Sequence, residues 1–149
     1  MLRYDPMSMR PFMSYPEPDY ARHWLKVIGA AETKPVFAHV NWFQRGDDGR
    51  FLWPGYRENL RPLLWLMQYR AGEVEGVQTP VGVIPAREEL NLEGLGEQAL
   101  ADLDTILTID VDRWQQEIKF REEHLSQFDG LPEEIWVAHR RVAEALDQP

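Results

Sequence analysis

The sequence of 149 residues contains no cysteine. Disulfide bonds, thiolate nucleophiles and cysteine-ligated zinc sites are therefore excluded, and this composition suits a cytoplasmic protein without requiring one. The densest apolar stretch, LLWLM at 63–67, is far shorter than the roughly 20 residues that a membrane-spanning helix needs. The N-terminus also lacks the order of basic, apolar and small residues that marks a signal peptide. We therefore expect no membrane partner and a cytoplasmic location.

The common catalytic and phosphate-binding motifs are also missing from the sequence. Neither GxxxxGK[ST] nor GxGxxG occurs, the serines lack the context of a nucleophile, and the four histidines show no metal-ligand spacing. The stretch DVD at 110–112 has the spacing that opens a calcium loop, but Trp114 stands where an oxygen ligand is needed. An acidic helix start explains it better. We therefore expect no catalytic residue and no metal ligand in these 149 residues.

Basic residues are scarce in the second half of the chain. Residues 75–149 hold 17 of the 25 acidic residues and 6 of the 16 basic ones, and the net charge of the chain is −9. An acidic chain is a poor candidate for binding nucleic acid or an anionic membrane. With 44% hydrophobic and 28% charged residues, the composition is that of a globular domain. A phosphorylated ligand would bind more favourably in the N-terminal half.

The first part of the chain predicts a mixture of loop, helix and strand. Residues 1–20 contain four prolines and no regular period, which indicates an extended or irregular segment. A short helix is predicted at 19–29, with Asp19 as N-cap and Gly29 as its end. The stretch PVFAHVNWF at 35–43 predicts a buried strand, followed by a hairpin turn and a return strand. That turn is RGDDGR, residues 45–50, and the return strand is FLWP, residues 51–54.

The rest of the chain is predicted to be mainly helical. A helix is expected at 59–69 and a further strand at 79–85, and the chain turns helical from about residue 96. Two apolar stripes of helical period follow, separated by FDGLPEE at 128–134; they are Val111, Trp114, Ile118 and Leu125, and then Ile135, Ala138, Val142 and Leu146. The predicted fold class is mixed α/β, a short β-sheet or hairpin with helices and an acidic C-terminal helical pair. We expect one domain over 1–149.

Several aromatic residues concentrate around one turn of the sequence. The stretch FLWPGYREN, residues 51–59, places three rings about a Pro-Gly pair and ends on Asn59. These rings form an aromatic cluster with two that precede them; its members are Trp42, Phe43, Phe51, Trp53 and Tyr56. Such rings pack in an ordinary hairpin core, but they also form a slot for a flat heterocycle. Stacking does not distinguish one base from another, so hydrogen bonds to the edge of the base would have to select it. An amide side chain can pair with the edge of guanine or, when it is turned over, with that of adenine.

The same region resembles GTP-dependent phosphoenolpyruvate carboxykinase. HVNWFQRGDDGRFLWPGYREN at 39–59 is similar to that family's HVNWFR…G.FLWPGFGEN. YDPMSMRPF at 4–12 resembles its HDPxAMRPF, and TPVGVIPAREELNLEGL at 79–95 resembles its TPIG.VP…LNL.GL. DVDRWQQEI and DGLPEEI fall where the family has its last helices. The resemblance covers the whole chain in order, and it implies the C-terminal part of the carboxykinase nucleotide-binding domain.

The resemblance implies an enzyme of gluconeogenesis. That enzyme is a lyase that decarboxylates oxaloacetate and uses GTP to form phosphoenolpyruvate, carbon dioxide and GDP, with Mn²⁺ and Mg²⁺. The matching aromatics would surround the guanine, the amide would address its edge, and the run 56–59 would bind nucleotide. The implied nucleotide-binding residues are Phe43, Phe51, Tyr56, Arg57, Glu58 and Asn59. Phe12, with Arg10 beside it, would lie on the substrate side.

The sequence departs from the family pattern in ways that bear on activity. Tyr56 stands where the family has Phe, which keeps the ring, and Arg57 replaces a glycine in the nucleotide run. The family enzyme is several times longer, and its phosphate loop and metal ligands lie upstream of what matches here. We therefore expect a C-terminal piece that is inactive alone. The alternatives are a stand-alone non-catalytic module that binds a nucleotide or a partner, or a remnant that associates through its apolar segment 1–20.

Overall fold

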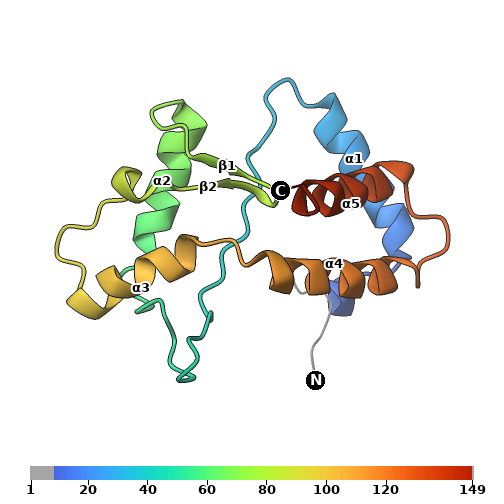
Figure 1. The fold of residues 1–149 in the computed structure, drawn as a ribbon. Helices are drawn as coiled ribbons and strands as arrows, with labels where there is room; N and C mark the ends of the chain where they lie inside the picture. Colours follow the sequence, from blue (N-terminus) through green and yellow to red (C-terminus); the bar gives the residue numbers. More distant parts are fainter. Residues whose placement is uncertain (1–8, 149) are drawn as a thin grey trace. The chain divides into compact units, whose positions relative to one another are not determined.

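Helices dominate residues 9–148, the part of the chain that the computed structural model describes (Figure 1). The chain separates into two compact units. Unit 2 is the continuous segment Val36–Ile109, and unit 1 combines the chain before that segment with the chain after it. Within the described residues, no helix has both the length and the apolar character needed to cross a membrane.

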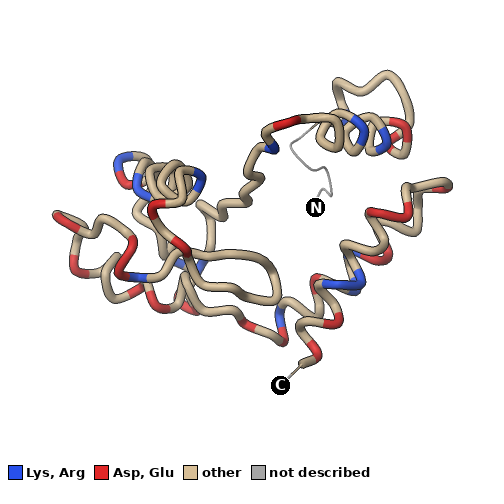
Figure 2. Tube along the Cα trace, turned by 90° about the horizontal axis from the view of Figure 1, so that it is seen from above, with Lys and Arg blue, Asp and Glu red and all other residues tan. Residues whose placement is uncertain are grey.

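Unit 1 contains three helices: α1, Glu17–Ala30; α4, Val111–Leu125; and α5, Glu133–Leu146. Helix α4 begins where the Asp110 carboxylate accepts a hydrogen bond from the backbone N–H of Arg113 at 3.1 Å, a normal N-cap. Lys and Arg are interspersed with Asp and Glu along these helices (Figure 2). Residues of both charge signs therefore occur along these helices.

Helices α4 and α5 pack against each other and bury a small core. Ile118 of α4 and Leu146 of α5 are almost fully buried. The loop between these helices contacts α1, because Arg22 donates from its guanidinium to the carbonyl oxygen of Gly130 at 2.6 Å. Unit 1 is therefore held together by contacts between its two separate chain segments.

A neutral histidine is buried between α4 and α5. His139 is 6% exposed, and its Nδ1 accepts a hydrogen bond from Nε of Arg121 at 3.1 Å, so its own proton lies on Nε2. Burial lowers the pKa of His139, and the positive charge of Arg121 lowers it further. Arg140 acts in the same direction and Glu122 opposes it. The folded protein therefore disfavours the imidazolium form.

We expect the stability of unit 1 to fall as the pH drops below about 6.5, the ordinary pKa of histidine. The unfolded chain then binds a proton that buried His139 resists, so the stability present above pH 6.5 is lost on acidification. The loss at pH 5.5 is at most about 1.4 kcal/mol. Thermal melts at pH 7.5 and 5.5 measure it. His139→Gln should reduce the difference, whereas exposed His23→Gln should not; equal effects would contradict the prediction.

Unit 2 contains α2, Leu60–Ala71; β1, Val77–Thr79; β2, Gly82–Ile84; and α3, Glu97–Leu107. The two strands pair antiparallel in a tight hairpin (Figure 1). The buried apolar residues of unit 2 come from α2, from α3 and from the loops before these helices. They are Leu52, Trp53, Trp65, Leu95, Ala99 and Leu103. The core of unit 2 therefore includes one ring of the aromatic cluster, that of Trp53.

One carboxylate joins three segments of unit 2. Glu89, in the short 3-10 helix Arg87–Glu89, accepts a hydrogen bond from the indole of Trp65 at 2.8 Å. It also accepts from three backbone N–H groups, those of Glu75 at 3.1 Å, Gly76 at 3.0 Å and Ala86 at 3.2 Å. These bonds lower the pKa of Glu89, the Gly76 bond most and the Trp65 bond next. The bonds link α2, the start of the hairpin and the 3-10 helix.

The strand predicted at 35–43 is wrong. This segment has no regular structure in unit 2, and most of it is exposed, although its residues are β-branched and aromatic. A strand is stabilised by its neighbours, and the predicted return strand contributes only one isolated bridge, between Arg45 and Phe51. The strand predicted at 79–85 is shorter, and it pairs with residues 77–79.

The helix predicted at 59–69 is confirmed by α2, which ends at Gly72 in the left-handed conformation. The helix predicted at 19–29 is confirmed with different ends. Helix α1 begins at Glu17, with Pro16 rather than Asp19 as N-cap, and continues through Gly29. Prolines in a first turn favour a helix start, so the proline-rich segment ends sooner than its composition suggests.

Candidate functional site

The turn predicted at 45–50 exists and is closed by backbone hydrogen bonds. Gly46 N–H donates to the carbonyl oxygen of Arg50 at 3.0 Å, and Leu52 N–H donates to Gln44 at 2.9 Å. The Asp48 carboxylate accepts from the backbone N–H of Arg50 at 2.9 Å, as Asp does in tight turns. The turn therefore has a defined shape and brings Phe51 back beside Arg45.

A bidentate ion pair joins this turn to α3. The guanidinium of Arg50 donates two hydrogen bonds to the Asp102 carboxylate, at 2.6 and 3.1 Å. Asp102 is buried, and the hydrogen bond from Arg50 lowers the pKa of its carboxyl group. The same contact raises the pKa of Arg50. Parallel bonds of this kind restrict orientation as well as distance, so the turn is held in one geometry against α3.

Two of the predicted ring residues contact each other at the surface of unit 2. The rings of Phe43 and Phe51 lie edge to face, with centroids 5.9 Å apart and an angle of 63° between the planes. The Arg45 guanidinium lies over the Phe51 ring, 4.0 Å from its centroid, which is a cation–π geometry. Phe43 is 72% exposed and Phe51 43%. Large apolar surfaces therefore remain available for stacking.

The third predicted ring follows the Pro-Gly turn. Gly55 has φ +96°, as the third position of a type II turn requires, and Tyr56 after it is 97% exposed. Leu52 and Trp53 in the same stretch are buried, at 5% and 8% exposure. The aromatic cluster is thus divided between core and surface: Trp53 packs inside unit 2, whereas Tyr56 contacts solvent.

Asn59 occupies the N-cap position of α2, but its side chain does not cap that helix. Its Oδ1 accepts a hydrogen bond from the buried indole N–H of Trp53 at 2.9 Å. The sequence reasoning did not find Trp53 as a partner of Asn59, although both lie in the stretch 51–59. A Trp followed by an amide six residues later is the signal that the sequence offered.

The two charged residues of the predicted run differ in exposure. Glu58 pairs with Arg61 at 2.5 Å, and both side chains are largely buried, whereas Arg57 is 92% exposed and lies 3.8 Å from Glu58. Arg61 also donates to the backbone carbonyl oxygens of Glu93, at 2.9 Å, and Asn91. Glu58 therefore supports the loop after the hairpin through Arg61, and Arg57 extends into solvent.

The predicted substrate-side residues belong to unit 1, and the six nucleotide-side residues belong to unit 2. Arg10 pairs with Glu17 at 2.8 Å, and its guanidinium lies 5.8 Å from the ring centroid of Phe128. Phe12 is 87% exposed, within a short 3-10 helix, Arg10–Phe12. Most of the motif at 4–12 lies outside the described residues.

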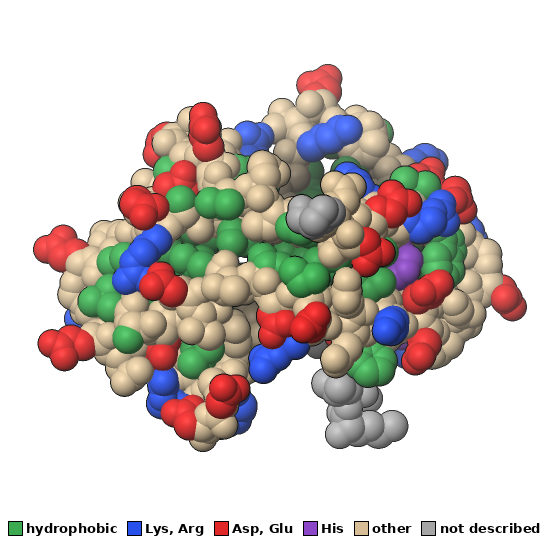
Figure 3. Space-filling view, viewed as in Figure 1, with side chains coloured by type: hydrophobic (Ala, Val, Ile, Leu, Met, Phe, Trp, Pro, Cys, Tyr) green, Lys and Arg blue, Asp and Glu red, His purple; other side chains and the backbone are tan. Residues whose placement is uncertain are grey.

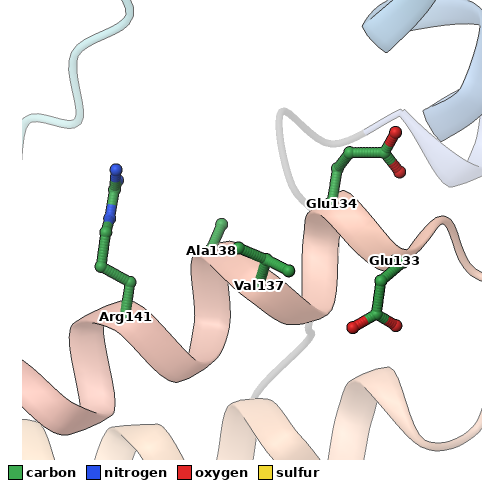
Figure 4. A pocket seen from close by; sticks show the side chains of 5 residues that line it. All are labelled: Glu133, Glu134, Val137, Ala138 and Arg141. Atoms are coloured by element: carbon green, nitrogen blue, oxygen red, sulfur yellow. The ribbon is translucent and has the colours of Figure 1, made fainter.

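Other parts of the described chain offer weaker candidates. A shallow hollow runs along α5, lined by Glu133, Glu134, Val137, Ala138 and Arg141 (Figure 4). Side chains of a single helix line it, so it does not enclose a ligand as a binding pocket does. Residues 9–148 also contain no group of three or more His, Asp or Glu residues arranged to hold a metal ion. The exposed rings Phe43, Phe51 and Tyr56, with Asn59 in the same stretch of the chain, are the strongest candidate site.

Comparisons with known proteins agree on one family. The family model for the phosphoenolpyruvate carboxykinase C-terminal P-loop domain matches residues 1–145. Phosphoenolpyruvate carboxykinase (GTP) of Thermoplasma volcanium is 40% identical over 134 residues, and that of Corynebacterium kroppenstedtii is 41% identical over 138. The mitochondrial enzyme of Mus musculus is 37% identical over 137 residues. These matches cover 90–91% of this chain but 21–22% of each relative, so the chain spans about a fifth of their length.

Proposed function

Because the chain belongs to the family of GTP-dependent phosphoenolpyruvate carboxykinases, we propose that it supplies the guanine-binding part of such an enzyme. The whole enzyme would convert oxaloacetate and GTP to phosphoenolpyruvate, carbon dioxide and GDP, a reaction of gluconeogenesis in the cytoplasm. Both units, residues 1–149, would then belong to its C-terminal nucleotide-binding domain. No acidic or histidine cluster in residues 9–148 fits the Mn²⁺ and Mg²⁺ of that reaction, so we derive no step through a metal.

The observation that carries this proposal is a set of exposed rings in the segment 43–56, two of which, Phe43 and Phe51, contact each other. The rings of Phe43, Phe51 and Tyr56 are exposed to water. Covering their apolar surface with a ligand would lower the free energy of the system. A purine would stack on these faces, and each stacked base gains about 1–3 kcal/mol. Asn59 lies at the start of α2 in the same segment. Its amide can form the hydrogen bonds that distinguish one base from another, which stacking cannot do. Arg57 and Glu58 follow Tyr56, and the Arg57 side chain is exposed to solvent.

We expect the 149-residue chain to bind guanine nucleotides weakly, with a Kd on the order of millimolar, about −4 kcal/mol. GMP, GDP and GTP should bind alike, because the chain has no phosphate loop to distinguish them. Tyr56→Ala should weaken binding of GDP and ADP together, about fivefold or more, because stacking ignores the base. Titration followed by NMR measures this. Phe120→Ala, which removes an exposed ring of α4, is the control and should leave both affinities unchanged.

We expect no carboxykinase turnover from the 149-residue chain alone. Phosphoryl transfer depends on positioning the phosphates and neutralising their charge with metal ions. The sequence has no phosphate-loop motif, and the described residues have no metal cluster. Purified chain would be assayed with oxaloacetate, GTP and Mn²⁺. Turnover equal to that of a full-length relative, assayed alongside, would contradict the prediction.

A second candidate function is binding of a protein partner, including a second copy of this chain. Four exposed residues of α2 have the i, i+3, i+4, i+7 spacing of one helix face: Leu60, Leu63, Leu64 and Met67. Figure 3 shows hydrophobic side chains at the surface of unit 2 between charged ones. The segment 1–20 is also apolar, but residues 1–8 lie outside the described part. Sedimentation that shows association, together with titrations that show no nucleotide binding, would favour this function.

A further inference from the structure

Trp53 contacts the proposed site from inside the core. Its ring is 8% exposed, and its Nε1–H lies 2.9 Å from Oδ1 of Asn59. An indole N–H only donates, so the amide atom that faces it must be an acceptor. The orientation of the Asn59 amide therefore follows from its partner, because turning it over would set two donors against each other.

The rest of the Asn59 side chain is left for another partner. Asparagine at an N-cap normally uses its oxygen to accept a helix N–H, but Asn59 makes no such bond to α2. Within residues 9–148, the Asn59 Nδ2 donates no hydrogen bond, and no buried side-chain nitrogen or oxygen lacks a partner. The Asn59 side chain is half-buried. Its NH₂ group therefore remains a donor that water or a ligand can reach.

The direction of an amide decides which purine it fits. Guanine places an acceptor at position 6 beside a donor at position 1, and adenine places them in the opposite order. A freely rotating amide meets either base by turning over, so it provides no choice. An amide that is held in one direction meets one base with both hydrogen bonds and sets like groups against the other.

We propose that Trp53 is a positioning residue that sets the choice between guanine and adenine by fixing the amide of Asn59. The inference rests on the proposed purine site and adds to it the origin of its selectivity. In the proposed site guanine binds the amide in its present direction, so adenine would require the amide to turn over and would leave the buried indole N–H of Trp53 without an acceptor. That penalty corresponds to a discrimination of about tenfold or more. Asn59 contacts the base, and Trp53 acts through Asn59.

The test compares GDP and ADP binding to the full chain and its Trp53→Phe variant. Phenylalanine keeps an apolar ring in the core and removes the N–H. We expect the ratio of the ADP to the GDP dissociation constant to fall from about tenfold or more to within about threefold of unity. Affinity for ADP should not decrease, because the stacking rings are untouched. Titrations followed by NMR resonances of the Asn59 side-chain amide measure both constants and report the amide itself.

Trp65→Phe is the matched control, because it also removes a buried indole N–H bond in unit 2, the one to Glu89 at 2.8 Å. It should destabilise the unit without changing the ADP to GDP ratio. If both variants lower the ratio equally, or if Trp53→Phe keeps the wild-type ratio, the inference fails while the purine site stands. If the wild-type chain binds neither nucleotide, the proposed site fails and takes the inference with it.

A second variant covers the case in which Trp53→Phe does not fold. Site-specific replacement of Trp53 by benzothienylalanine keeps the shape of the indole and exchanges the N–H for sulfur. A ratio of the ADP to the GDP dissociation constant near one in this variant supports the inference, because the packing volume is nearly unchanged. A wild-type ratio of these dissociation constants overturns the inference, because the variant lacks the hydrogen bond to Asn59 and would still distinguish the two bases.

Discussion

A Gly76→Ala variant is expected to lose about 3 kcal/mol of unfolding free energy in unit 2. Gly76 precedes β1 with φ +68°, a conformation that costs an L-residue about 1–2 kcal/mol. A Cβ there would lie 2.5 Å from Cγ1 of Val83, 2.8 Å from the carbonyl oxygen of Ile84 and 3.0 Å from the Trp65 ring. Backbone and a buried indole cannot move aside easily, so overpacking adds about 1–3 kcal/mol.

The matched control for Gly76 is Gly94→Ala. Gly94 has nearly the same φ, +69°, but no atom lies within 4 Å of a Cβ built there. It therefore measures the backbone strain without the crowding, and we expect a loss of about 1 kcal/mol. Chemical denaturation followed by tryptophan fluorescence compares the two variants. Equal losses would mean that the hairpin does not pack against Trp65 as described.

Glu89→Gln is expected to produce the second large effect, a lowering of the melting temperature by about 5 °C or more. Each carboxylate oxygen of Glu89 accepts two hydrogen bonds: Oε1 from Glu75 and Gly76, Oε2 from Trp65 and Ala86. A glutamine must place its NH₂ group at one of these positions, where it meets two donors. The substitution therefore loses two bonds and leaves two N–H groups without their acceptors.

The effect of Glu89→Gln should depend on pH in a defined direction. Because the pKa of Glu89 lies below its ordinary value of 4.5, the carboxylate stabilises the fold fully above that pH. The stabilisation is lost as the pH falls below 4.5 through the lowered pKa. Melts of wild type and variant should therefore differ at pH 7 and converge near pH 3. Glu88→Gln, at the exposed neighbour, is the control, and a constant difference across pH would contradict the assignment.

Local sequence signals predicted the helices well and the strands poorly. Helix α2 was recognised from its apolar residues and from the turn that precedes it, because these signals act within a few residues. The segment 35–43 has strand-forming residues, yet it lacks a partner strand along unit 2. Strand formation depends on pairing and burial that a local pattern does not contain. The short strand 77–79 was missed, because its residues are mostly exposed.

The sequence proposed the residues of the candidate site but not the contacts that they make. The motif 51–59 identified the rings and Asn59 through a resemblance, and the structure places Asn59 at the start of α2 as expected. The contact of Arg50 with Asp102 joins residues far apart in the sequence, and nothing in either segment indicates the other. Nor does the sequence say that Trp53 is buried while Tyr56 is exposed. Tertiary packing makes that distinction.

The insertion of unit 2 within unit 1 has a consequence for folding order. Unit 2 is one continuous segment, so it can fold as soon as it leaves the ribosome. Helix α1 leaves the ribosome first but finds its contact at Gly130 only after all of unit 2 has been made. Until then α1 has no partner in unit 1. The contact between α1 and Gly130 closes a loop that contains all of unit 2, and closing so long a loop slows the assembly of unit 1. A folded unit 2 shortens that loop, so the stability of unit 2 helps to set the rate at which α1 meets the loop at Gly130.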